Sequence, residues 1–105
     1  MVPAGFIHQA RITEAINDAA QKLRPDEVWH VAFSIGTDST DEPALFFRII
    51  LTDAASREDR LADVTSRVTA TLFDSLHPIE NWGLTPYFSF RSLSEHRQLN
   101  DPVWS

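Results

Sequence analysis

The segment GTDSTDEP places three acidic side chains, Asp38, Asp41 and Glu42, close enough together to offer oxygen ligands to a divalent cation. Their spacing lacks the calcium-loop pattern, which needs a central glycine and a terminal glutamate. Gly36 and Asp38 resemble only superficially the glycine-serine turn and paired carboxylates with which a nucleotidyltransferase holds its metal ions. Acidic turns are usually solvated, so we expect no metal ion here.

The histidines offer no catalytic or metal-binding pattern either. They are His8, His30, His77 and His96, and none has the HxH or HExxH spacing of metal ligands or a G-x-S-x-G nucleophile turn nearby. The chain has no glycine-rich phosphate loop. Glu58, Asp59 and Asp63 come at the start of an expected helix, where the helix dipole explains them better than catalysis does. We therefore predict that the protein is not an enzyme and binds no cofactor.

A set of aromatic, basic and apolar residues shares the second face of the expected sheet, because each alternates with the core residues of its strand. The set comprises His30, Phe46, Arg48, Ile50, Tyr87 and Arg91. Arginine with tyrosine and phenylalanine is typical of protein interfaces, and aromatic sheet faces also stack exposed bases. These residues, with Trp104, are our candidate partner-binding site. In a competing interpretation the two arginines are solvated strand residues paired to nearby carboxylates, and Phe46 and Ile50 pack under the C-terminal tail.

The elements that position this set follow from hydrophobic periodicity. Apolar residues recur at spacings of three and four over residues 8–23, which predicts an amphipathic helix that Pro25 ends. Residues 28–35 alternate with period two and predict a strand, and ALFFRIILT predicts a second. The two strands should pair as an antiparallel hairpin. A turn centred near Thr40 would place Ala32 opposite Arg48.

A second helix is expected over residues 57–76, with Ser56 and Asp59 as a capping box and His77-Pro78 at its end. The segment TPYFSFRS alternates again and predicts a third strand. The remaining tail, about residues 93–105, has room for one helical turn capped by Ser92 or Ser94. We see one domain over residues 1–105.

The predicted fold class is α+β, in the order α-β-β-α-β. A right-handed crossover through the second helix would bring the third strand beside the hairpin, giving a three-stranded sheet with two helices packed on one face. The residues expected on the covered face are Trp29, Phe33, Phe47, Ile49, Phe88 and Phe90.

Composition limits the partners. The 105 residues carry a formal net charge of −6, which disfavours nucleic acid and anionic membranes, and the chain has no cysteine, as suits a reducing cytosol. The segment MVPAGFIHQARITEAI has neither the basic region nor the apolar run of a signal peptide or anchor. We predict a cytoplasmic protein that binds a protein partner or a second copy of itself, and no membrane.

Two resemblances bear on this prediction. The stretches DEPALFFRIILTD and GLTPYFSFRSLSEHRQLNDPVW resemble small uncharacterised bacterial proteins associated with neighbouring HEPN-domain proteins, which implies an antitoxin-like member of a two-protein system. The element order is similar to that of type II KH domains, which implies an RNA- or ribosome-associated binding domain as the alternative. The chain lacks the G-x-x-G loop of that family. The expected function is non-enzymatic partner binding through the open sheet face.

Overall fold

The computed structural model describes residues 9–104. The first residue of the expected N-terminal helix, His8, lies outside the described residues. The described elements are α2 (Gln9–Ala20), β1 (Val28–Thr37), β2 (Pro43–Leu51), α3 (Leu61–Leu76), α4 (Pro78–Trp82), β3 (Thr85–Ser92), α5 (Leu93–Leu99) and the 3-10 turn η1 (Pro102–Trp104).

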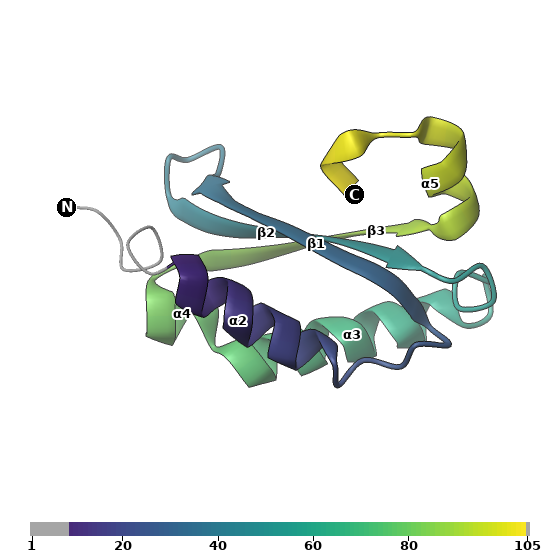
Figure 1. Ribbon diagram of the computed structural model, residues 1–105, viewed down its shortest axis with the longest axis horizontal. Coiled ribbons are helices and arrows are strands. Elements are labelled where there is room, and N and C mark those ends of the chain that lie inside the picture. The colour runs from purple at the N-terminus through teal and green to yellow at the C-terminus, as the bar shows by residue number, and fades with distance from the viewer. Residues whose placement is uncertain (1–8, 105) are drawn as a thin grey trace.

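The sheet has the order β1-β2-β3, with β1 antiparallel and β3 parallel to the central strand β2. Ala32 lies opposite Arg48, which confirms the predicted hairpin register. Because β2 and β3 are parallel, the chain must cross over between them, and α3 makes that crossover. Both α2 and α3 lie against one face of the sheet, as predicted, and the C-terminal segment α5–η1 lies over the other face (Figure 1).

The core lies between β2 and the two long helices. Its buried members include Ile12, Ile16 and Ala19 of α2, Leu45, Phe47, Ile49 and Leu51 of β2, and Val64, Val68, Leu72 and Leu76 of α3. Phe47 stacks on Phe88 of the neighbouring strand with ring centroids 5.0 Å apart. The β-branched residues of α3 are tolerated in the helix because two of them, Val64 and Val68, are buried in this core.

Trp29 is the one residue of the predicted core face that the structure places elsewhere. Its side chain is 51% exposed. The pairing of β1 is irregular between Val28 and His30, which lie opposite Leu51 and Ile50, so Trp29 is the extra residue of a β-bulge. The bulge breaks the strict alternation, and the indole lies 6.0 Å from the ring of His96 in α5.

The start of α3 also differs from the prediction. The helix begins at Leu61, and its N-cap residue Arg60 makes no side-chain capping hydrogen bond. Ser56, the expected cap, instead donates from Oγ to the carbonyl oxygen of Thr52 at 2.8 Å. His77 ends α3 in a left-handed conformation with φ of 42°, and the short helix α4, which the sequence pattern did not predict, follows at once.

A buried ion pair holds the first half of α3 to the turn before β1. The Glu27 carboxylate is 2% exposed and accepts hydrogen bonds from Arg67 Nη1 at 2.6 and 2.8 Å and from Arg60 Nη2 at 3.1 Å.

No helix among residues 9–104 has both the length and the apolar character that crossing a membrane would require.

Candidate partner-binding surface

The predicted set lies on the second sheet face, as the alternation indicated, but that face is divided into two parts. His30, Arg48 and Ile50 belong to the paired strands β1 and β2, and Phe46 lies beside Tyr87 in the parallel register of β2 and β3. One part is covered by the C-terminal segment and the other is open.

The C-terminal segment covers the part near the ends of β2 and β3. Ile50 is fully buried, so its assignment to an open partner-binding face is wrong, and the competing interpretation that it packs under the C-terminal tail is confirmed. Trp104 is 8% exposed and stacks on the guanidinium of Arg91, whose Cζ lies 4.0 Å from the ring centroid. Two of the predicted partner-binding residues, Ile50 and Trp104, are therefore used within the chain itself.

Hydrogen bonds fix the start of this segment. Ser92, one of the two predicted cap residues, caps α5 through a capping box with Glu95. Asp53 accepts from the backbone N–H of Ser94 at 3.0 Å and from its Oγ at 2.5 Å. These bonds lower the pKa of Asp53, the Ser94 hydroxyl being the largest cause.

The open part of the face is built around Tyr87. Its ring stacks on Phe46 at 5.6 Å with an interplanar angle of 19°, and its hydroxyl donates to Asp38 Oδ2 at 2.8 Å. Arg48 Nη1 donates to Ser34 Oγ at 3.0 Å. Among the described residues, Arg48 forms no ion pair, so its predicted pairing with a nearby carboxylate is not what the structure shows.

Asp38 organises the hairpin turn. Its Oδ1 accepts from Thr40 Oγ1 at 2.7 Å and from the backbone N–H groups of Thr40 and Glu42. The hydroxyls of Thr40 and then Tyr87 lower the pKa of Asp38 to about 2, and the Asp38 carboxylate raises the pKa of Tyr87 above its ordinary value of 10.0.

Over residues 9–104 no three histidine or acidic side chains come together as a metal site would require.

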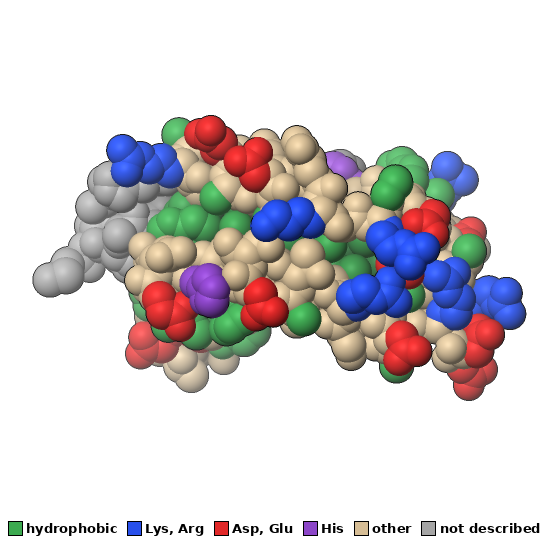
Figure 2. Space-filling model, turned by 90° about the horizontal axis from the view of Figure 1, so that it is seen from below, with side chains coloured by type: hydrophobic (Ala, Val, Ile, Leu, Met, Phe, Trp, Pro, Cys, Tyr) green, Lys and Arg blue, Asp and Glu red, His purple; other side chains and the backbone are tan. Residues whose placement is uncertain are grey.

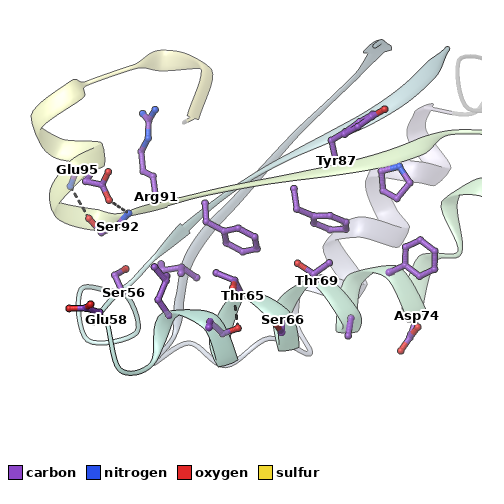
Figure 3. A pocket seen from close by; sticks show the side chains of 18 residues that line it. Ser56, Glu58, Thr65, Ser66, Thr69, Asp74, Tyr87, Arg91, Ser92 and Glu95 are labelled. Atoms are coloured by element: carbon purple, nitrogen blue, oxygen red, sulfur yellow. Dashed lines mark hydrogen bonds between the residues drawn. The ribbon is translucent and has the colours of Figure 1, made fainter. Parts of the chain in front are cut away.

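A groove of about 1090 Å³ lies between α3 and β3, and we call it the α3–β3 groove (Figure 3). Its apolar lining includes Phe73 of α3 and Pro86, Phe88 and Phe90 of β3. The helix side is made of small side chains, among them Ala62, Thr65, Ser66, Thr69 and Ala70. In the close-up Thr65 and Thr69 lie beneath the strand, so the two walls face each other.

Only two predicted site residues, Tyr87 and Arg91, line this groove. The Arg91 side chain turns away from α3 toward the C-terminal segment (Figure 3). The sequence pattern does not indicate the groove, because alternation along β3 assigns Phe88 and Phe90 wholly to the core. The available signal was Phe73, an apolar residue of α3 outside the stripe formed by Val64, Val68 and Leu72.

The backbone along the groove belongs to an edge strand. All eight residues of β3 pair with β2 without a register shift, and no strand among the described residues pairs with the other side of β3. Pro86 is compatible with this position, because an edge strand has backbone positions that need not donate to a neighbour. The other edge strand, β1, carries the bulge at Trp29, a feature that protects sheet edges from pairing.

Charge differs between the groove and the rest of the molecule. The acidic residues of the groove lining are Glu58, Asp74 and Glu95. Basic side chains gather instead at the end of the helix-covered face where α3 begins (Figure 2). There Arg60 and Arg67 are paired with Glu27, so much of this basic charge is neutralised.

No protein-family model, no curated protein and no solved structure matches this chain.

Proposed function

We propose that the protein is a non-enzymatic partner-binding module that receives an extended segment of another protein in the α3–β3 groove. The segment adds a strand to β3, and its alternate side chains face α3. The observation that carries the proposal is the coincidence of a regular eight-residue edge strand with an apolar groove along it. An edge supplies unpaired backbone groups, and the groove supplies pockets for alternate side chains, which together are the two requirements of strand addition.

The exposure of the groove residues supports this use. Phe73, Phe88 and Phe90 remain half-buried although each lines the groove, so a bound segment would remove apolar surface from water. Long regular edges are ready-made templates for pairing, and proteins usually protect them with bulges, charges or proline. A bulge protects β1 at Trp29, whereas β3 has no bulge and carries its one proline, Pro86, at the second residue of the strand.

The proposed binding site includes part of the partner-binding surface predicted from the sequence. Tyr87 is 42% exposed and lies between the open part of the sheet face and the groove, so a bound strand would pass along its backbone. RNA is the less favoured occupant, since phosphate binding needs a net basic lining and this lining carries Glu58, Asp74 and Glu95 against Arg91. An antitoxin-like role would be one setting for such a module.

The test is selection of peptides on the immobilised protein from a displayed library of random peptides about twelve residues long, enough to span the groove at about 3.3 Å per residue. Selected peptides are then titrated into the wild type and into Thr69→Arg, which puts a long charged side chain into the groove from its helix wall. Thr13→Arg in α2, outside the groove, is the matched control.

We expect Thr69→Arg to weaken binding about tenfold or more, a loss of about 1.4 kcal/mol, and Thr13→Arg to bind like the wild type. Amide chemical shifts should move along β3 and α3, and N-methylation of alternate peptide amides should abolish binding because it removes the donors of the added strand. Peptides that bind Thr69→Arg and the wild type equally would contradict the proposal.

A further inference from the structure

The walls of the α3–β3 groove carry charge of one sign at both ends. Glu58 and Glu95 lie at the end where α3 begins, and Asp74 lies at the other end (Figure 3). The one basic residue of the lining, Arg91, has its guanidinium stacked on Trp104 and directed away from α3. An occupant of the groove therefore has a carboxylate near each end, with Asp74 at the rim of the groove and directed away from β3.

These carboxylates are free of ion pairs within the part of the chain that the structure describes. Glu58 and Asp74 form no salt bridge there, and Glu95 accepts only the capping hydrogen bond from the backbone of Ser92. By contrast, Arg24, Arg57, Arg60 and Arg67 are each paired with a carboxylate. These four arginines are thus paired within the chain, whereas Glu58, Asp74 and Glu95 are not in ion pairs among the described residues.

We infer that the occupant of the groove is an extended basic segment of another protein, with alternating apolar residues between lysine or arginine residues at its two ends. This inference rests on the function proposed above and adds the chemistry of the partner. A partner of opposite charge is favoured because facing potentials that are complementary increase the association rate and exclude wrong partners.

The spacing of the basic residues follows from the helix. Leu61, the first residue of α3, and Asp74 are thirteen positions apart, which at 1.5 Å per residue gives the groove a length of about 20 Å along the helix. An extended chain covers that span in about six residues at about 3.3 Å each. A segment of about seven residues fits this span, and its two basic ends and the two apolar side chains between them, at alternate positions, all face α3.

A second copy of this chain fits less well. Two copies paired through β3 about a two-fold axis would run antiparallel, and their α3 helices would then also be antiparallel. Glu58 of one copy would approach Asp74 of the other, so carboxylates would face each other at both ends. The net charge of −6 on each chain adds to this repulsion.

The experiment uses three peptides of alternating valine and threonine that differ only in the residues at both ends, which are arginine, glutamine or glutamate. Each is titrated into the wild type and into the double variant Glu58→Lys/Asp74→Lys, with binding followed by amide chemical shifts. Surface ion pairs contribute up to about 1 kcal/mol each, so we expect the arginine-ended peptide to bind up to about fivefold more tightly per pair than the glutamine-ended one. The double variant should reverse the order and prefer the glutamate-ended peptide.

Each outcome separates the inference from the proposed function. Equal affinity for the three peptides, with shifts along β3 that Thr69→Arg abolishes, would overturn the basic partner and keep strand addition. Failure of all three peptides and of every library peptide to bind would overturn both. If the wild type sediments as a dimer and Thr69→Arg as a monomer, the occupant is a second copy of the chain. If a single-stranded RNA binds more tightly than any peptide, the occupant is nucleic acid. Either result overturns the inference of a basic protein segment.

Discussion

The buried ion pair of Glu27 with Arg60 and Arg67 is predicted to stabilise the packing of α3, and substitutions of these residues test that prediction. Arg67→Met removes the guanidinium that donates to both carboxylate oxygens, and Arg60 remains as the second partner at 3.1 Å. Because Glu27 is 2% exposed, this change leaves a buried charge without its main partner. Glu27→Gln removes the charge itself, and it leaves two arginine side chains that are 37% and 47% exposed and can turn into water.

The two changes should therefore differ in cost. Breaking a buried ion pair from one side costs about 3 to 5 kcal/mol, and the retained Arg60 places Arg67→Met near about 3 kcal/mol. Glu27→Gln loses charge-assisted hydrogen bonds but leaves no buried charge, so we expect about 2 kcal/mol. In the Glu27→Gln background, the further change Arg67→Met should lower the free energy of unfolding by less than about 1 kcal/mol, because the carboxylate that the guanidinium neutralises is already absent.

Urea denaturation of the four proteins in this cycle measures the coupling energy. For a domain of about 100 residues, 1 kcal/mol corresponds to a shift in Tm of about 4 to 8 °C, so thermal melts give an independent check. Arg24→Met is the control, because the Arg24–Asp26 pair is about 60% exposed on both sides and should contribute under about 1 kcal/mol. If Arg67→Met costs the same with and without Glu27, the pair does not hold α3 and the reasoning fails.

Two further predictions concern the sheet face. Tyr87 is the lone tyrosine, so phenolate absorbance reports its pKa directly, and Asp38→Asn should bring that pKa down toward 10.0. The same two shifts predict how stability depends on pH. Because the pKa of Tyr87 is raised in the folded protein, its contribution to stability is lost as pH rises above about 10. Because the pKa of Asp38 is lowered, its contribution is lost as pH falls from 3.8 through about 2. An unchanged phenolate titration would refute the contact. Trp104→Ala should cost about 3 kcal/mol, the low end for a buried tryptophan, because α5 and η1 can detach from the sheet without unfolding the core. The amides of α5 should then exchange with solvent before those of β2, and uniform exchange would contradict this prediction.

The sequence pattern predicted the order of elements, the hairpin register and the third strand because each depends on local periodicity. It failed where a tertiary contact replaces a local signal. Trp29 continues the period-two pattern of β1, and nothing in the residues around it marks the bulge that turns it outward. Ser56 and Asp59 have the spacing of a capping box, but the start of α3 is held by Glu27, whose distance along the chain hides it from any motif.

The candidate site was predicted only in part for a related reason. Alternation correctly placed Phe46, Tyr87 and Arg91 on the second face, but it carries no information on what covers a face. The tail docks over Ile50 through the stacking of Trp104 on Arg91 and the hydrogen bond from Ser94 to Asp53, and both contacts join residues that no local pattern pairs. The α3–β3 groove needs the relative position of a helix and an edge strand, which periodicity along either one does not contain.

The α3–β3 groove is held in shape by contacts within the chain, and this bears on how tightly it would bind the proposed segment. Its strand wall is fixed by the eight-residue pairing of β3 with the buried strand β2. Its helix wall is fixed by Val64, Val68 and Leu72 in the core and by the two arginines on Glu27. A groove whose width is set in advance adds no ordering cost of its own when a segment enters, so most of the entropy lost on binding is that of the segment. Variants that loosen α3, such as Arg67→Met, should therefore weaken peptide binding without touching the groove lining.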